Sequence, residues 1–345
     1  MGVYLGLIAL LLTLSLLIKA GIRDKKRQER AILTLSMMAL FLLLSLKSTW
    51  VGTDMPGYRA QYELAGSMPF GDFSYVYFEK GYLLVTKLFS KCGIPFSLFT
   101  AAVYALLFRA YHAFLHRYSQ NTTLSVLILI CYQFLVFHIS GLRQTLAMAV
   151  CIWAFLALER SVLLSLCLTA LAASFHSSAL IFFAIYPVTA LRKRPKPLTM
   201  LLLAVPAALC LRPVLWMAIS RYLPQIENTG IRLGGNCLFL GLMALFLCFT
   251  QSAYPESGKQ APFFCRMAVL AFAADLVLSG STLLRGNLFF TVFLLPGIPN
   301  AIRQYPPRVR LLLALAMSGF LILLFYTDTL AINQLDLLPY RFFWQ

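Results

Sequence analysis

The chain has 345 residues, of which 60% are hydrophobic and 12% are charged, and its formal net charge is +17. Soluble domains carry about 25% charged residues, so the composition argues against a water-soluble protein and predicts a membrane protein. Nucleic-acid binding is not expected, because the basic residues cluster between apolar runs and form no basic surface interleaved with aromatic residues.

The apolar runs predict an all-α, polytopic transmembrane helix bundle with about twelve crossings, some of them short and broken. Five helices are expected in the first half of the chain, at 3–18, 31–49, 95–114, 123–138 and 144–158. Residues 161–191 are too long for one crossing and predict two short helices that meet near His176. Five more helices are expected at 198–217, 237–251, 262–279, 287–302 and 309–326. We therefore expect one integral membrane domain over residues 1–345.

Basic residues set the expected orientation. The first apolar run has no basic residue before it, and a cluster follows it that comprises Arg23, Lys25, Lys26, Arg27 and Arg30. This order differs from that of a cleaved signal peptide, and the positive-inside rule places the cluster in the cytoplasm. Twelve crossings then put both termini outside and keep the basic run Arg192, Lys193, Arg194 and Lys196 inside.

Residues 50–93 are predicted to form an extracytoplasmic loop that includes an amphipathic helix lying at the membrane interface. Two acidic residues in this loop, Asp54 and Glu79, are candidates for chemistry. The alternatives are ordinary: Asp54 also suits a turn, and Glu79 suits a solvated or helix-starting position.

Three further polar residues lie where apolar helices are expected to meet the outer surface. Arg143 follows Gly141 at a helical turn, and a charge at membrane depth usually faces a cavity, a partner or a ligand; the alternative is an arginine that reaches the headgroups. His176 lies at the break in 161–191, where non-helical backbone is tolerated if it lines a cavity or is buried in protein. Arg285 and, in a loop, Arg232 are further outer arginines, and guanidinium groups bind phosphate oxygens well.

Motifs of nucleotide-binding and hydrolytic enzymes are absent, including Walker A, HExxH and GxSxG patterns. The four histidines are well separated, and the eight cysteines form no metal-like spacing. No metal and no other cofactor are therefore expected.

Several short motifs together resemble one family. They are Gly52-Thr53-Asp54 with Tyr58, Glu79-Lys80-Gly81-Tyr82, Arg143-Gln144, Ser174-Phe175-His176-Ser177-Ser178-Ala179 and Leu338-Pro339-Tyr340-Arg341-Phe342. Their identity and order over nearly the whole chain resemble the EpsG family, which is similar to the Wzy-type polymerases of bacterial capsules and exopolysaccharides.

The resemblance implies a multi-pass glycosyltransferase of the bacterial plasma (inner) membrane with a GT-C-like fold. Such an enzyme joins polyprenyl-diphosphate-linked oligosaccharide repeat units, which serve as donor and acceptor, on the extracytoplasmic face without a metal. The lipid bilayer and proteins of polysaccharide export or chain-length control would be its partners.

The same resemblance suggests roles for the candidate residues. Arg143 and Arg285 would bind the diphosphate leaving group. His176 would be the general base, with Glu79 or Asp54 as the alternative base or as a sugar-orienting group, and attack opposite the diphosphate would invert the anomeric centre. The expected substrate contacts are Tyr58, Tyr82, Gln144, Ser178 and Asn287.

Two other functions fit the sequence. An O-antigen-type ligase would use the same donor and the same arginines with a different acceptor. A transporter or flippase of lipid-linked oligosaccharides would also need polar residues among its helices, but transporters often contain paired broken helices in two repeats. One broken crossing and a one-sided polar set favour an enzyme; an acyltransferase that uses His176 is a weaker alternative.

Overall fold

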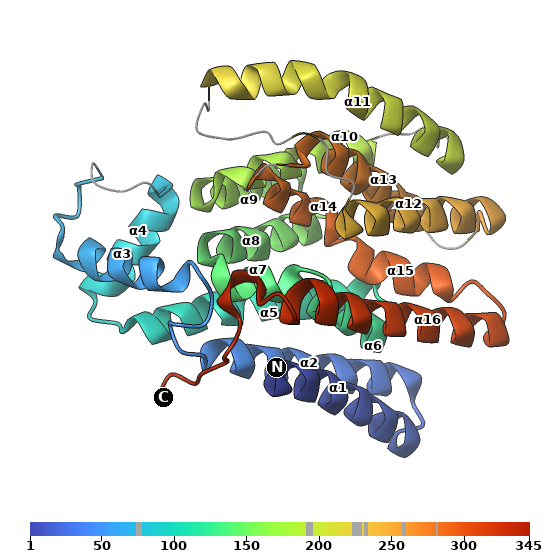
Figure 1. The fold of residues 1–345 in the computed structure, drawn as a ribbon, viewed down its shortest axis with the longest axis horizontal. Helices are drawn as coiled ribbons and strands as arrows, with labels where there is room; N and C mark the ends of the chain where they lie inside the picture. Colours follow the sequence, from blue (N-terminus) through green and yellow to red (C-terminus); the bar gives the residue numbers. More distant parts are fainter. Residues whose placement is uncertain (74–77, 191–195, 223–229, 231–233, 257–259, 281) are drawn as a thin grey trace. The chain divides into compact units, whose positions relative to one another are not determined.

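The computed structural model of the chain describes residues 1–73, 78–190, 196–222, 230, 234–256, 260–280 and 282–345. The elements in this part of the chain are helices, with one isolated β-bridge between Lys47 and Phe342 (Figure 1). The predicted all-α fold is confirmed. Four basic residues of the sequence analysis lie outside the described residues, namely Arg192, Lys193, Arg194 and Arg232.

Seven of the described helices are long and apolar enough to cross a membrane, and a bent helix pair brings the number to eight. Three shorter apolar helices are also present, at Leu142–Leu158, Val162–Phe175 and Ser177–Ala190. These helices confirm a membrane protein, whereas the prediction of about twelve crossings is not confirmed. The orientation of the termini and a single membrane domain stay predictions.

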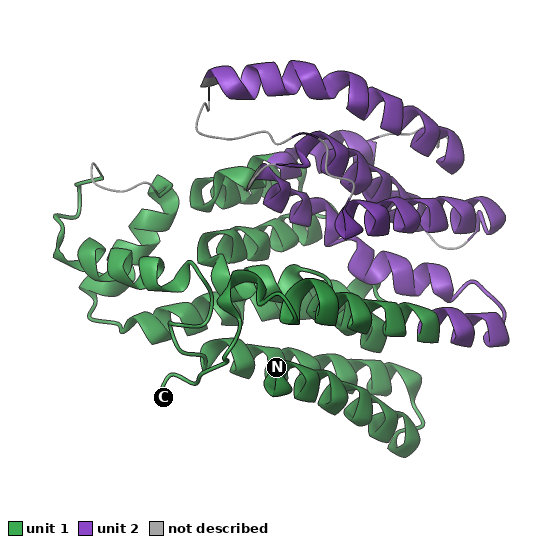
Figure 2. Ribbon diagram, in the orientation of Figure 1, with its two compact units in different colours: residues 1–180, 315–345 green, residues 181–314 purple. Residues whose placement is uncertain are grey.

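The chain forms two compact units, residues 1–180 with 315–345 and residues 181–314 (Figure 2). The first unit contains α1 (Gly2–Gly21), α2 (Lys25–Ser45), α3 (Met55–Ser67), α4 (Lys80–Lys91), α5 (Phe96–Tyr118), α6 (Thr122–Cys131), α7 (Phe134–Ser140), α8 (Leu142–Leu158) and α9 (Val162–Phe175). It also contains most of α16 (Pro307–Phe325), followed by η3 (Tyr326–Leu330) and η4 (Gln334–Asp336).

Polar side chains start several of these helices. The carboxylate of Asp24 accepts hydrogen bonds from the first N–H groups of α2, at 2.8 Å from Lys26. Asn121 and Ser161 do the same for α6 and α9. Such caps satisfy N–H groups that have no partner within the helix, so each cap fixes where its helix begins.

The helices of the first unit are interrupted at three places. The predicted helix 123–138 is bent by 53° between α6 and α7, where Gln133 has a φ of 38°. Gly141 alone separates α7 from α8. The chain leaves the helical conformation again at His176, which has an extended backbone (φ −156°, ψ 119°) between α9 and η1 (Ser177–Ala184). The predicted break in 161–191 is therefore confirmed at His176.

The segment 50–93 contains two helices, α3 and α4. The sequence predicted the second, which is amphipathic, but not the first. Lys87 on α4 is fully buried, and its ammonium group donates to the carbonyls of Pro69 at 2.9 Å and of Asp72. This lysine ties the chain after α3 to α4, so the described residues on the two sides of the segment 74–77 are held together by buried contacts.

The C-terminal residues pack against the start of the chain within the first unit. Ser48 donates its N–H to the Arg341 carbonyl at 2.8 Å, and the Tyr340 hydroxyl donates to the Leu43 carbonyl at 2.6 Å. Before them, Leu335 and Asp336 have φ values of 56° and 54°, a left-handed conformation that is costly for residues with side chains. This strained turn directs two carbonyls toward residues 52 and 53.

The second unit contains α10 (Ile185–Ala190), α11 (Pro197–Tyr222), α12 (Gly235–Ala253), α13 (Ala261–Leu278), η2 (Thr282–Asn287), α14 (Leu288–Thr291) and α15 (Leu294–Ile302). Ala208, Cys237 and Leu276 form a buried cluster that joins α11, α12 and α13. Arg212 of α11 donates to the Leu276 and Val277 carbonyls, both at 2.8 Å. It thereby satisfies carbonyls at the end of α13 that lack helical partners.

Candidate active site

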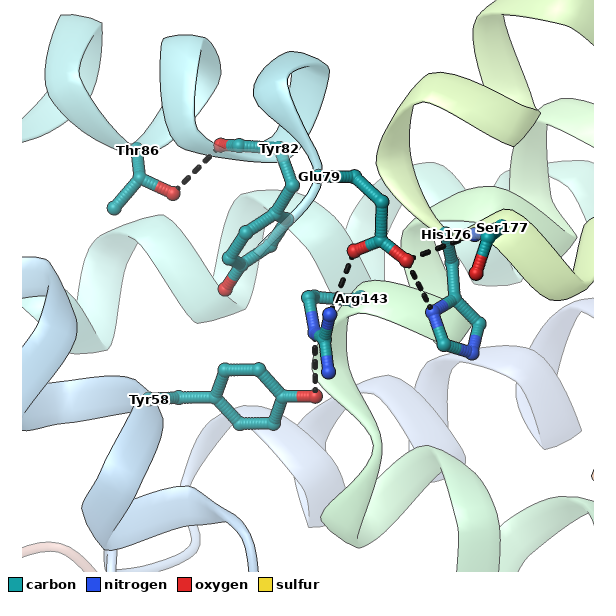
Figure 3. A network of polar contacts seen from close by, with 7 residues as sticks. All are labelled: Tyr58, Glu79, Tyr82, Thr86, Arg143, His176 and Ser177. Carbon is teal, nitrogen blue, oxygen red and sulfur yellow. Dashed lines mark hydrogen bonds and ion pairs between the residues drawn. The ribbon is translucent and has the colours of Figure 1, made fainter. Parts of the chain in front are cut away.

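Glu79 lies at the centre of a polar network in the first unit (Figure 3). Its Oε2 accepts a hydrogen bond from Arg143 Nη1 at 2.6 Å. Its Oε1 lies 3.1 Å from His176 Nδ1 and accepts the N–H of Ser177 at 2.8 Å. One carboxylate at the start of α4 therefore holds the first turn of α8 and the break after α9.

The guanidinium of Arg143 is held by aromatic groups as well as by Glu79. Its Nε donates to the Tyr58 hydroxyl at 3.4 Å, and its Cζ lies 4.3 Å from the centroid of the Phe78 ring. The Tyr58, Phe78 and Tyr82 rings pack against one another with centroids 5.5–6.0 Å apart. Aromatic rings attract a cation through their faces, so this cluster fixes the arginine without neutralising its charge.

The network is partly buried. The side chains of Glu79, Arg143 and His176 have exposed fractions of 19%, 21% and 22%. This degree of burial strengthens the charge interactions relative to water, while a ligand can still reach the three groups. Within the described residues, the Arg143 N–H groups not used by Glu79 and Tyr58 make no hydrogen bond, so they can serve an anion.

Electrostatics fix the charge of Glu79. Burial alone would raise the pKa of its carboxyl, but the hydrogen bonds from His176 and Ser177, with the charge of Arg143, hold that pKa well below its ordinary value. An ionised carboxylate can only accept hydrogen bonds, so His176 Nδ1 must carry the proton in their shared contact. The neutral imidazole then has its lone pair on Nε2, the nitrogen that faces away from Glu79 (Figure 3).

Gly81 allows α4 to approach α9 at the site. A Cβ atom at this position would lie 2.7 Å from the Ser174 carbonyl oxygen and would also collide with the Ser174 hydroxyl. Since glycine has no side chain, the helix beginning after Glu79 packs directly on the last turn of α9. This contact brings the Glu79–Gly81 motif against the Ser174–Ser177 motif.

The Gly52-Thr53-Asp54 turn supports the other side of the site. Gly52 has a φ of 103°, and a Cβ there would lie 2.8 Å from the Ile139 carbonyl. The Asp54 N–H donates to the Ser140 hydroxyl at 3.1 Å, three residues before Arg143. The Thr53 hydroxyl in turn donates to Asp336 Oδ2 at 2.9 Å. The C-terminal turn, the 52–54 turn and the α7–α8 junction are thus linked.

Of the candidate residues predicted from the sequence, some belong to the Glu79 network and others lie beside it. Asp54 precedes α3 and lies one turn before Tyr58, whose pKa is raised by burial. Tyr82 is 1% exposed and packs in the aromatic cluster, while Gln144 is buried next to Arg143. Ser178 follows the break at His176, and its hydroxyl oxygen is buried without a hydrogen-bond partner in the described structure.

Two predicted residues belong to the second unit. Arg285 lies in η2. Asn287 is 3% exposed, and its side-chain amide donates to the Ala271 carbonyl at 2.9 Å. That bond ties the end of η2 to α13, so the amide nitrogen of Asn287 has a structural role. A diphosphate site shared by Arg143 and Arg285 stays a prediction.

Sequence reasoning missed two contributions to the site, the Phe78 ring against Arg143 and the Ser177 N–H on Glu79. Phe78 directly precedes Glu79, and Ser177 directly follows His176. Their position next to two candidate residues was the only feature of the sequence that could have indicated these contributions. Among the described residues, no group of three or more His, Cys, Asp or Glu side chains is arranged to bind a metal ion.

The apolar helices and the charged network define a membrane protein with a polar site held at helix ends. Residues 30–342 match the EpsG family, and because this match covers nearly the whole chain, the protein belongs to that family. Membership indicates a membrane protein of the polysaccharide-polymerase class, as the sequence motifs predicted. No curated protein and no solved structure shows a significant match to the chain.

Proposed function

We propose that the protein is a polysaccharide polymerase of the bacterial plasma membrane that transfers a polyprenyl-diphosphate-linked glycan to a hydroxyl of another lipid-linked repeat unit. The observation that carries the proposal is the Glu79 carboxylate, which joins Arg143 and His176 in one partly buried network. In this proposal the helical fold is GT-C-like and the reaction takes place on the extracytoplasmic face.

Arg143 stabilises the leaving group. Breaking the bond between the anomeric carbon and the diphosphate places additional negative charge on phosphate oxygens, and fixed cations lower the energy of such a transition state. Glu79 and the Phe78 ring hold the guanidinium in place, so it needs little reorganisation when that charge develops. Arg285 is the second cation of this proposal.

His176 accepts the proton of the acceptor hydroxyl. Its Nδ1–H is bound to Glu79, so Nε2 is the nitrogen that takes the proton, as in other histidine bases that a carboxylate orients. The hydroxyl oxygen forms the new bond to the anomeric carbon on the side opposite the departing diphosphate, which inverts that centre. Glu79 acts in this proposal as a positioning residue, because its low pKa makes it a poor base. Asp54 lies near Tyr58 and would orient a sugar.

The distribution of charge within the first unit supports the proposed sidedness. Arg143 lies in the first turn of α8, and Arg160 follows its last turn. The 17 residues of this helix rise about 25 Å, so Arg160 lies near the opposite end, where Arg30, Arg109 and Arg117 line the same cavity. The positive-inside rule assigns that end to the cytoplasm.

The test uses the full chain in proteoliposomes supplied with purified lipid-linked repeat units. The wild type should form products of increasing length and release the lipid diphosphate, and Arg143→Ala and His176→Ala should lose both. Arg59→Ala is a matched control, since this exposed arginine pairs with Glu63 on the surface of α3. Full polymerisation by both site variants would overturn the proposal. Transfer to a different acceptor would favour a ligase, and movement of intact substrate across the membrane would favour a flippase.

A further inference from the structure

A charged cavity lies in the first unit, at the opposite end of α8 from Glu79. It has a volume of about 820 Å³ and is lined by side chains of α2, α5, α8 and α9 and of the α8–α9 turn. Its basic residues are Arg30, Arg109, His112, His116, Arg117 and Arg160. None of them takes part in the network around Glu79, so the proposed transfer reaction leaves this cavity unexplained.

The positive charge of the cavity is only partly balanced. Arg117 forms an ion pair with Glu159, whereas Arg30, Arg109 and Arg160 form no ion pair with a carboxylate among the described residues. Four guanidinium groups on three segments of chain, namely α2, α5 and the α8–α9 turn, therefore border one hollow beside a single carboxylate partner. Like charges so arranged repel one another, and an anion bound among them would relieve that repulsion.

Several of the basic groups are held in position. The guanidinium of Arg109 lies 5.7 Å from the centroid of the Trp153 ring. The His112 and His116 rings are parallel with centroids 6.0 Å apart, and His112 Nε2 lies 3.1 Å from the Thr34 hydroxyl. Side chains that are fixed before binding lose less conformational entropy when a ligand arrives, so the cavity resembles a prepared site more than a set of mobile surface arginines.

The apolar part of the cavity indicates what kind of anion fits. Leu164 and Leu168 of α9 line it, and Leu171 continues the same helical face toward the middle of the apolar segment. Leu164 and Leu171 have exposed fractions of 50% and 45%. A free phosphate ion would use only the basic part. A lipid would use both parts, with its phosphate among the arginines and an acyl chain along the leucines.

We propose that this cavity is a binding site for the phosphate headgroup of an anionic phospholipid. Guanidinium groups bind phosphate oxygens through paired hydrogen bonds, and basic pockets between transmembrane helices are suited to lipid phosphates. The bound lipid would fasten the cytoplasmic ends of α2, α5, α8 and α9 together. The proposal is independent of the glycosyl-transfer reaction, because the cavity contains none of the residues of the Glu79 network and the test measures no activity.

The test measures lipid binding by the full chain in detergent. Phosphatidylglycerol should raise the melting temperature and remain bound in native mass spectra, whereas phosphatidylcholine and inorganic phosphate should do neither. The variant Arg109→Gln/Arg160→Gln should weaken phosphatidylglycerol binding roughly thirtyfold, because each basic residue near an anionic lipid contributes about fivefold. The control Lys25→Gln/Lys26→Gln removes the same charge outside the cavity and should have a much smaller effect.

Three results would overturn the proposal. Equal weakening in the two double variants would show attraction to the general surface charge. Equal stabilisation by inorganic phosphate would show a site for small anions, and no response of the wild type to phosphatidylglycerol would show no site. If the double variant does not fold, the single variants Arg109→Gln and Arg160→Gln, both at exposed positions, provide the same comparison.

Discussion

Glu79 and His176 are separated by 97 residues, yet Glu79 Oε1 lies 3.1 Å from His176 Nδ1. The contact requires the start of α4 to lie at the break after α9, and it orients the imidazole through an ionised carboxylate. The same carboxylate binds Arg143, so the proposed proton acceptor and the proposed leaving-group cation share one anchor.

Acidification should remove the stabilising effect of Glu79. Because the pKa of Glu79 is held below its ordinary value of 4.5 in the folded protein, ionisation stabilises the fold at pH values above 4.5. This stabilisation is lost as the pH falls from that value through the folded-state pKa. The melting-temperature difference between the wild type and Glu79→Gln should be constant from about pH 7 to pH 5.5 and shrink below about pH 4.5. A difference that grows on acidification would contradict the low pKa.

The aromatic face should matter more to Arg143 than the tyrosine hydroxyl does. Phe78→Leu removes a ring 4.3 Å from the guanidinium, an interaction worth about 0.5–2 kcal/mol, and should slow transfer about tenfold. Tyr58→Phe removes a long hydrogen bond of 3.4 Å and should slow it less than about threefold. Rates of diphosphate release compare the two variants, and the reverse order would show that Tyr58 contacts the substrate.

Lysine should not replace arginine at position 143. The guanidinium reaches Glu79 and Tyr58 with two different nitrogens, whereas one ammonium group lacks that planar fork. Arg143→Lys should therefore slow transfer about tenfold or more even though it keeps the charge, and Arg143→Ala should slow it further. Wild-type rates for Arg143→Lys, measured at saturating substrate, would mean that charge alone is sufficient.

A methyl group at Gly81 should separate α4 from α9. Gly81→Ala places a Cβ 2.7 Å from the Ser174 carbonyl, and such overpacking costs about 1–3 kcal/mol. Both the melting temperature and the rate should fall, because the displaced helix carries Glu79. Gly57→Ala is the matched control, since a Cβ there meets nothing within 4 Å. Equal stability of the two variants would show that α4 does not approach α9 so closely.

The C-terminal turn should support the site from a distance. Thr53→Val removes the hydrogen bond to Asp336 and should lower stability by about 0.5–1 kcal/mol. The transfer rate should fall as well, since the 52–54 turn binds Ser140 before Arg143. Thr327→Val removes a comparable bond to Asp328 outside this linkage and should leave the rate unchanged. Equal transfer rates in the two variants would show that the hydrogen bond between Thr53 and Asp336 does not support the site.

Sequence alone could predict two of the three positions at which the helices of the first unit are interrupted, but not the bend at Gln133. The length of 161–191 required a break near His176, and a lone arginine after Gly141 marked the α7–α8 junction. The first feature follows from the length of the segment relative to the thickness of a membrane, and the second from the cost of a charge in an apolar segment. Both can be judged from a short stretch of sequence. The candidate residues Arg143 and His176 on these two segments can therefore be proposed without knowledge of tertiary contacts.

The pairing within the site could not be read from sequence. Nothing in the motif at 79–81 indicates that Glu79 binds Arg143 and His176 together, since that depends on the packing of Gly81 against Ser174. The helix α3 was missed because the glycine, aspartate and proline residues at its start indicate a turn, although its buried residues Met55, Tyr58, Tyr62 and Ala65 recur at helical spacing. The number of crossings was harder still, because α8, α9 and the segment after His176 are short and the helix pair α6–α7 is bent.

The central claim is that Glu79 and His176 act as one unit in glycosyl transfer, and a double-variant comparison tests it most directly. The measurement is the single-turnover rate of diphosphate release from lipid-linked repeat units by the wild type, Glu79→Gln, His176→Ala and the double variant. Groups that act as a unit give strongly non-additive losses, so the double variant should be no slower than His176→Ala. Losses that multiply, or a His176→Ala variant as fast as the wild type, would contradict the account.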